Sequence, residues 1–374
     1  MNRLLTVLVL VLLTAGCATG GQSVQPVPPG KPAPFLRLPP GFRADILVEN
    51  VPNARSMALG PGGTLFVGTR SGGKVYAVRD ALSGAPIVET FASGLSMPNG
   101  VALQDGALYV AEQKRILRYR GAETRGTPPP VPEVVDGALP YKGPLHSWKY
   151  LAFGPDGKLY VPIGAPCNVC LEPGFGVILR MNPDGSGREV VASGVRNSVG
   201  FDWHPRTGEL WFTDNGRDML GDEVPPCELN RISRPGLDFG FPYCHGGSIP
   251  DPEFGTAGTC SAAEPPVQLL GPHVAPLAVT FYTGRMFPPA YRGQVLIAEH
   301  GSWNRSKAAG KTGYRITLVR LKGNEAVAYE PFIEGWLEGD EVLGRPVDLL
   351  VAPDGSLLVS DDQRGVIYRI SYQG

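Results

Sequence analysis

The feature that most constrains the fold of this chain is a strand–turn–strand unit that recurs six times. Each unit contains an apolar segment, a polar turn with glycine, and a second apolar segment. The second segments read TLFVGT, ALYVAE, KLYVPI, ELWFTD, QVLIAE and SLLVSD, and the turn glycines are Gly63, Gly106, Gly157, Gly208, Gly293 and Gly355. Units of this kind at intervals of roughly 40 to 50 residues are typical of β-propellers, in which each repeat forms one blade. We therefore predict an all-β fold, a six-bladed β-propeller.

The N-terminus indicates export. A largely apolar segment over residues 4–13 is too short to span a membrane, and the TAGC sequence ending at Cys17 resembles a bacterial lipoprotein cleavage site. We predict a lipoprotein-type signal peptide over residues 1–17 with lipidation of Cys17, a disordered Pro- and Gly-rich tether over 18–40, and the propeller over 41–374. The alternative is ordinary signal cleavage nearby. The predicted location is periplasmic, with membrane contact only through the lipid anchor.

Five cysteines follow Cys17, and an oxidising compartment favours their pairing. Cys167 and Cys170 form a CxxC pair that has no second CxxC or histidine pair to complete a metal site, so a disulfide is favoured. A second predicted disulfide joins Cys244 to Cys260 across a Gly- and Pro-rich insertion. Cys227 is then left as a single thiol.

The charge of the chain is balanced, with 34 Lys and Arg against 35 Asp and Glu. Such a chain has no basic field for nucleic acid, so we exclude that partner. Polar residues nevertheless stand where successive blade strands begin and end, positions that meet around the axis of a propeller. These residues include Arg55, Arg70, Asn99, His146, Lys149, Arg196, Asn197, His273, His300 and Arg345. Where the inner strands begin, cations outnumber acids, which predicts a site for an anionic small molecule.

His146 is the first candidate for a general base. It immediately precedes the inner segment of a blade, and an ordinary histidine pKa suits proton abstraction from a hydroxyl. The competing interpretations are a loop histidine bonded to the backbone, and His300 as the base instead.

Several motifs, in order over residues 42–370, resemble the glucose/sorbosone dehydrogenase family: HSWKYLAFGPDGKLYV, GVRNSVGFDW, DNGRD, FGFPYCHGG and HGSWNRS. The resemblance implies a sugar or sorbosone dehydrogenase-like oxidoreductase that uses pyrroloquinoline quinone (PQQ) and Ca²⁺. Its substrate would be a sugar or a sugar-derived aldehyde or alcohol, and its electron acceptor is left open.

The same resemblance assigns roles to single residues. His146 matches the general base, and Arg196 and Asn197 match a pair at the quinone. The other implied cofactor contacts are Arg345 and either Arg305 or Lys307, and the implied metal-site residues are Gly216, Arg217, Asp222 and Glu228.

Two other functions remain open on the residues alone. A Ca²⁺-dependent lactonase or esterase would use carboxylates such as Glu112, Asp214 or Glu299 with a metal-bound water and no quinone. A propeller can also bind a partner on its rim without catalysis, because the fold does not determine the function.

Overall fold

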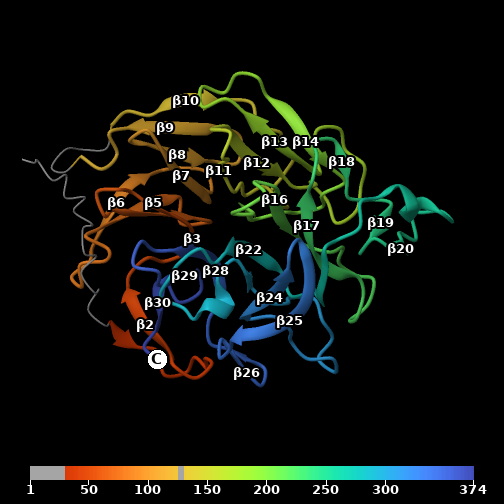
Figure 1. Ribbon diagram of the computed structural model, residues 1–374. Coiled ribbons are helices and arrows are strands. Elements are labelled where there is room, and N and C mark those ends of the chain that lie inside the picture. Colours follow the sequence, from red (N-terminus) through yellow and green to blue (C-terminus); the bar gives the residue numbers. More distant parts are fainter. Residues whose placement is uncertain (1–29, 125–129) are drawn as a thin grey trace, which may run out of the picture.

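The structure is a computed structural model that describes residues 30–124 and 130–374. Within these ranges six sheets are arranged as the blades of a propeller (Figure 1). The first three blades contain β3 (Ala54–Leu59), β4 (Leu65–Thr69), β5 (Lys74–Arg79) and β6 (Ile87–Ser93); β7 (Gly100–Gln104), β8 (Ala107–Ala111), β9 (Ile116–Arg120) and β10 (Glu133–Asp136); and β11 (Ala152–Phe153), β12 (Leu159–Ile163), β13 (Val177–Met181), β14 (Glu189–Ser193) and β18 (Leu237–Asp238). The predicted all-β, six-bladed fold is confirmed.

In the remaining three blades the strands are again given from the axis outward. They contain β15 (Phe201–Trp203), β16 (Leu210–Asp214), β17 (Pro226–Ile232) and β21 (Gln268–Pro272); β22 (Pro276–Phe281), β23 (Val295–Glu299), β24 (Arg315–Lys322) and β25 (Glu325–Ile333); and β28 (Pro346–Val351), β29 (Leu357–Asp361), β30 (Val366–Tyr372), β2 (Phe42–Val48) and β1 (Lys31–Pro32). Small hairpins pair β19 (Cys244–His245) with β20 (Ile249–Pro250), and β26 (Leu337–Glu338) with β27 (Glu341–Val342).

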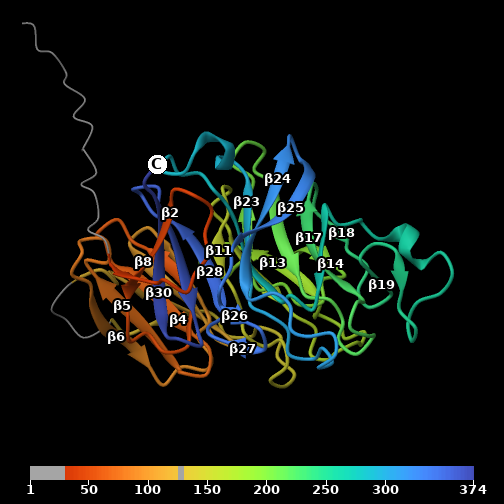
Figure 2. The same cartoon turned by 90° about the horizontal axis from the view of Figure 1, so that it is seen from below.

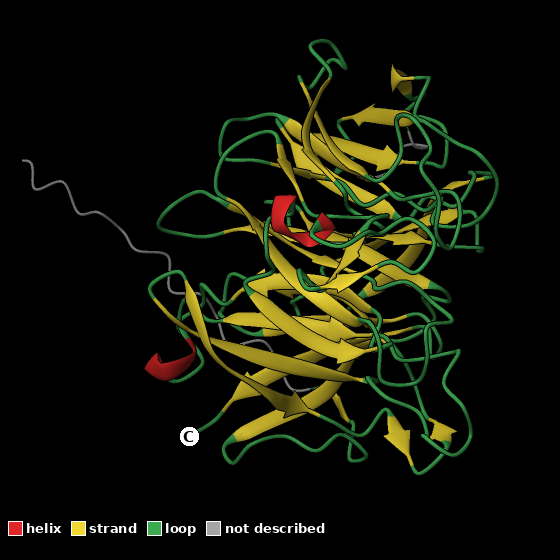
Figure 3. Cartoon of the chain, turned by 90° about the vertical axis from the view of Figure 1, so that its right-hand side faces the viewer, coloured by secondary structure: helices red, strands yellow, loops and turns green. Residues whose placement is uncertain are grey.

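Helix is nearly absent from the described residues, as Figure 3 shows. Its two short 3-10 turns are η1 (Thr259–Ala262) and η2 (Pro289–Tyr291). No helix in the described ranges is long and apolar enough to cross a membrane.

The repeated turns explain how each blade starts. All six turn glycines, Gly63 to Gly355, have positive φ values between 70° and 85°. Glycine adopts this region without the steric penalty of a side chain, so the tight connection between first and second strands selects it.

The core lies between the blades. The second strand of every blade is fully buried along its length, in β4, β8, β12, β16, β23 and β29. A strand with neighbours on both faces must be apolar throughout, which accounts for the continuous apolar segments in the sequence. The stacked sheets hold the strand ends in fixed positions around the axis.

The ring is closed by strands from both ends of the chain. β2 pairs antiparallel with β30, with Phe42 opposite Tyr372 (Figures 1 and 2). The predicted tether is partly corrected here, because β1 extends the same sheet and the side chains of Ala33 and Leu36 are buried against it. Apolar residues among the many prolines make this contact, so the propeller begins near residue 31 rather than 41. The predicted signal peptide and Cys17 lie outside the described residues.

Both predicted disulfides are present, Cys167–Cys170 and Cys244–Cys260, and Cys227 is a buried free thiol. The second bridge closes the insertion that carries β19 and β20, which lies to one side of the ring in two views (Figures 1 and 2). This insertion has few core residues of its own, so the covalent link limits its unfolded conformations.

Candidate functional site

A cavity of about 340 Å³ lies where the inner strands begin. Its wall includes four arginines, Arg55, Arg70, Arg196 and Arg345, against one carboxylate, Asp218, among the residues that the structure describes. A volume of this size holds a small organic molecule. The predicted excess of cations around the axis is therefore found at this cavity, although the whole chain is nearly neutral.

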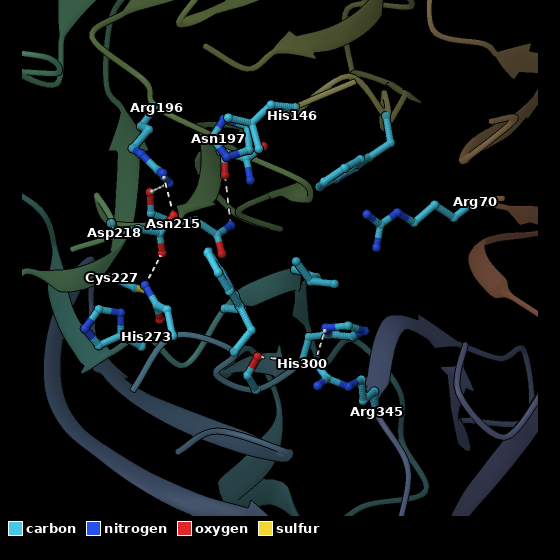
Figure 4. Close-up of a pocket in the computed structure, with 18 of the residues that line it drawn as sticks. Arg70, His146, Arg196, Asn197, Asn215, Asp218, Cys227, His273, His300 and Arg345 are labelled. Atoms are coloured by element: carbon cyan, nitrogen blue, oxygen red, sulfur yellow. Dashed lines mark hydrogen bonds and ion pairs between the residues drawn. The ribbon is translucent and has the colours of Figure 1, made fainter. Parts of the chain in front are cut away.

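Arg70 and Arg345 are the two cavity arginines without a carboxylate partner in the described ranges. The Arg70 guanidinium lies 4.3 Å from the centre of the Trp148 ring, and it extends toward the open space in Figure 4. Burial and the charges of Arg55 and Arg345 lower the pKa of Arg70 from its ordinary value. Arg345 donates from Nη2 to the Tyr314 hydroxyl at 3.1 Å. An anion in the cavity would offset the repulsion of the Arg70 charge by those of Arg55 and Arg345.

Arg196 is buried in the wall and held from several sides. Its Nε donates to the carbonyl of Asn168 at 2.9 Å, and Nη1 donates to the carbonyl of Asn215 at 3.1 Å. Nη2 donates to Asn168 Oδ1 and to Asp218 Oδ2, at 2.9 and 3.0 Å. These four bonds occupy all but one of the five N–H groups of the guanidinium, which fixes its plane beside the cavity.

His146 lies next to Asn197 at the cavity wall (Figure 4). Its backbone has φ 48°, a left-handed conformation that is uncommon outside glycine and is concentrated at functional sites. Nδ1 donates to the Ala165 carbonyl at 2.8 Å, so the lone pair is on Nε2, which has no partner in the described parts of the chain. Burial, with the charge of Arg196, lowers the pKa of His146 to about 3. The ring is therefore neutral, with an unprotonated Nε2.

His300, the alternative base, has both ring nitrogens engaged. Nε2 lies 2.9 Å from Asp362 Oδ1, and Arg345 Nη1 lies 3.3 Å from Nδ1. An arginine can only donate, so Nδ1 is the acceptor and Nε2 carries the proton. The His300 ring thus links a carboxylate to an arginine, and no lone pair remains for a substrate.

One buried polar atom of the wall, the indole Nε1 of Trp148, has no hydrogen-bond partner within the described ranges. The side-chain amide of Asn197 is a further polar group at the same wall. Unpartnered buried groups are costly, and a ligand that accepts from them removes the cost. Together with the unpaired Arg70, these donors fit a planar anion such as the implied PQQ.

The implied metal-site residues are brought together only in part, because Gly216 and Glu228 line one small pocket and Asp222 does not. Gly216 lines the cavity, but the Arg217 side chain turns away to Asp251 and Glu253. Asp222 accepts from the backbone and hydroxyl of Ser306, both at 2.7 Å. No group of three His, Cys, Asp or Glu side chains in the described residues could hold a metal ion.

Glu228 is buried in β17 opposite Asp214, and both line a small pocket with Gly216. Its oxygens accept from Asn230 Nδ2 at 2.9 Å and from the Gly246 N–H at 2.7 Å. Burial raises the pKa of Glu228. Asp222 does not join Glu228 at this pocket because it accepts from Ser306, and the assignment of a metal to the four residues stays a prediction.

Arg305 and Lys307 do not reach the cavity either. Arg305 donates to the Asp222 carbonyl at 2.7 Å and to Glu223 at 2.8 Å, because its loop packs against the loop that follows β16. Lys307 is exposed. The same loop instead brings Trp303, 70% exposed, and Asn304 to the cavity wall. Arg305 or Lys307 was expected to place a cation at the cavity, and Arg70 from the first blade lines the cavity instead.

Sequence reasoning did not assign a role to Trp148, Asn168, Asp218 or Asn304. The CxxC pair around Asn168 and the DNGRD turn were visible signals, but the contacts join segments from three blades and have no signature of local spacing. Cys227 lines the cavity, and burial raises the pKa of its thiol to about 12, so it is not a thiolate nucleophile.

The chain is similar to known proteins in sequence and in fold. The family model described as Glucose / Sorbosone dehydrogenase matches residues 109–369. An uncharacterized protein of Borreliella burgdorferi is 34% identical over 358 residues, covering 90% of this chain and 91% of that protein.

Two solved structures are similar in fold. The PQQ domain of pyranose dehydrogenase from Coprinopsis cinerea, in its holo form, has a TM-score of 0.75 at 18% identity, covering 92% of this chain and 98% of that one. The PQQ-bound aldose sugar dehydrogenase from Streptomyces coelicolor has a TM-score of 0.64 at 23% identity, covering 90% and 99%.

Proposed function

The chain belongs to the glucose/sorbosone dehydrogenase family, and from this premise we propose that it oxidises a sugar or a sugar-derived aldehyde or alcohol with PQQ and Ca²⁺. The observation that carries the proposal is the cavity with four arginines and one carboxylate in the described residues, in which a neutral histidine keeps a free Nε2. We further propose that the protein is exported and lipidated at Cys17.

The cavity supplies the groups that would hold the cofactor. Arg70 and Arg345 lack carboxylate partners in the described chain, the indole N–H of Trp148 is unpartnered there, and the amide of Asn197 lies at the same wall. Several cations are needed to neutralise a polyanion, and oriented N–H groups add direction. When bound, the quinone supplies an electron-accepting carbonyl that protein side chains lack.

The residues of this chain have distinct roles in the proposed reaction. His146 accepts the proton of the substrate hydroxyl at Nε2, and the bond from Nδ1 to the Ala165 carbonyl holds the ring in this tautomer. Arg196 presents its remaining N–H toward the cavity from a fixed position and favours negative charge there. The exposed Trp303 offers an apolar surface at the wall for the substrate.

Calcium enters the proposal only together with the cofactor. The described side chains form no metal cage, so backbone carbonyls such as those of Gly216 and Arg217 would supply the protein ligands. Oxygen ligands suit this ion, but two neutral carbonyls are too few to retain it alone. We therefore expect Ca²⁺ binding to depend on PQQ carboxylates.

The lactonase alternative is less favoured because its carboxylates are already occupied. Glu112 pairs with Arg115 and accepts from the Ser96 N–H, and Glu299 pairs with Arg315 at 2.8 Å. Neither lines the cavity.

Calorimetry and dye-linked turnover test the proposal. We expect PQQ to bind in millimolar Ca²⁺ and not in a chelator, and the loaded protein to reduce a dye with an aldose or a sugar-derived aldehyde. Absence of PQQ binding in Ca²⁺ would overturn the cofactor assignment. Hydrolysis of a lactone by quinone-free protein would transfer the assignment to the lactonase class.

A further inference from the structure

The segment that follows β12 contacts both candidate catalytic residues. The Ala165 carbonyl accepts from His146 Nδ1, and the Ala165 N–H donates to the Arg196 carbonyl, both at 2.8 Å. Three residues later, Asn168 contacts the Arg196 guanidinium. The segment over residues 164–170 is not regular strand, so its own conformation has to be fixed by other means.

The backbone carbonyl and the side-chain amide of Asn168 join Arg196 to Asp218. Its carbonyl and Oδ1 each accept from Arg196 at 2.9 Å. Oδ1 also accepts from the Asp218 N–H at 2.9 Å, while Nδ2 donates to the Asp218 carbonyl at 3.0 Å. Asp218 then accepts from Arg196 at 3.0 Å and from Asn304 at 2.5 Å. The network connects the loops of three blades at the cavity wall.

The Cys167–Cys170 disulfide closes a short ring around Asn168 and Val169. A covalent ring of this length leaves the enclosed residues few backbone conformations. Both cysteines are half-buried and flank the residue that contacts Arg196, whereas the Cys244–Cys260 bridge belongs to the insertion that carries β19 and β20.

We propose that Asn168 is a positioning residue for Arg196, and that the Cys167–Cys170 bridge maintains Asn168 in the conformation this requires. The ligand whose affinity reports this positioning is PQQ, so the inference rests on the proposed function. Without Asn168, the guanidinium loses two acceptors and its remaining N–H no longer has a fixed direction.

A double-mutant cycle tests the positioning. In Ca²⁺, Asn168→Ala should weaken PQQ binding about tenfold, as loss of an oriented charge-assisted contact does. Arg196→Ala should weaken it further, and the double variant should be within about twofold of Arg196→Ala, because Asn168 acts through Arg196. Independent, additive losses of affinity would overturn the inference. Asn182→Ala, which changes an exposed turn asparagine, is the matched control and should bind PQQ as the wild type does.

A comparison of the two disulfides tests the role of the Cys167–Cys170 bridge. Cys167→Ser with Cys170→Ser should reproduce the loss of PQQ affinity, whereas Cys244→Ser with Cys260→Ser should lower the melting temperature and leave the affinity of the remaining folded protein unchanged. Equal affinity losses in both pairs would contradict the assignment. This pair also supplies the test if Asn168→Ala does not fold.

A cofactor-free measurement separates this inference from the proposed function. In ¹⁵N NMR of the ligand-free protein, the Arg196 guanidinium should show restricted rotation that is lost in Asn168→Ala. If the wild type does not bind PQQ but this change occurs, the proposed function fails and the positioning stands. If rotation is the same in both proteins, the positioning is wrong.

Discussion

His146 and His300 show how one hydrogen bond decides what a histidine can do. Both rings are buried at the same cavity, and burial lowers the pKa of both. His146 contacts a carbonyl through Nδ1, whereas His300 contacts a carboxylate and an arginine. Only His146 therefore keeps a lone pair free, and the difference could not be read from two histidines that each lie beside an apolar strand.

The first residue-scale prediction concerns removal of this base. His146→Gln should lower kcat by about 10²- to 10⁴-fold, because a positioned base is lost. PQQ affinity should change little, since glutamine keeps a polar group of similar size. His300→Gln should instead weaken PQQ binding, because Arg345 loses its contact with the ring. Turnover equal to wild type in His146→Gln, with turnover lost in His300→Gln, would identify His300 as the base.

The second prediction concerns the protonation of His146 without cofactor. An ordinary histidine titrates near pH 6.5, whereas burial and Arg196 lower the pKa of His146 to about 3. The His146 ring signals in NMR of the ligand-free protein should therefore not change between pH 8 and 5. Below about pH 6.5 the His146 side chain binds a proton in the unfolded chain but not in the folded chain. Protonation of His146 therefore lowers the stability of the folded protein as the pH falls. A midpoint near 6.5 for His146 would refute the burial argument.

At the scale of elements, the sequence identified the blades better than the bounds of their inner strands. The first apolar segments of two units follow His146 and Asn197 in the sequence, but the inner strands β11 and β15 begin only at Ala152 and Phe201. The cause is visible before β15, where the N–H groups of Arg196 and Asn197 donate to the Asp214 carboxylate at 2.8 and 2.6 Å. A side chain there replaces the neighbouring strand as hydrogen-bond acceptor, and the backbone is free to face the cavity.

Loops were the least predictable elements. The motif HGSWNRS identified a loop that reaches the axis, but its basic residues point to the Asp222 loop and its Trp303 and Asn304 reach the cavity. Which side chain faces inward depends on contacts between loops of different blades, and no local periodicity encodes those contacts. Turn glycines, by contrast, were predicted correctly, because each occupies a position with positive φ in a tight turn, where a side chain would carry a steric penalty.

At the scale of the whole molecule, the positive charges are clustered in one place although they do not outnumber the negative charges. Acids and bases balance over the chain, but cations are concentrated at one end of the axis. Ring closure maintains this arrangement, since the wall residues come from several blades and each blade is held in place by its neighbours. Closure depends on β2 and on the buried side chains of Ala33 and Leu36.

Shortened chains should test closure. A chain that starts at residue 40 loses β1 and the Ala33 and Leu36 contacts, and should lose roughly 2 to 4 kcal/mol of stability relative to one that starts at residue 30. A chain that starts at residue 50 also loses β2, which exposes the outer edge of β30. We expect it to melt without cooperativity or to associate in size-exclusion chromatography. A cooperative transition at the same temperature as the residue-30 chain would show that closure is unnecessary.

The pairing of β2 with β30 also has a consequence for synthesis on the ribosome. β2 is translated before the first of the five other blades, and its partner β30 after the last of them. The main strands of blades 1 to 5 are translated in order, and only β18 of the third blade follows strands of the fourth, but the sixth blade must wait for translation to pass β30. Until then β2 has no partner strand from its own sheet beyond β1. A premature stop codon before β30 would therefore deprive the ring of its closure, however complete the other five blades are.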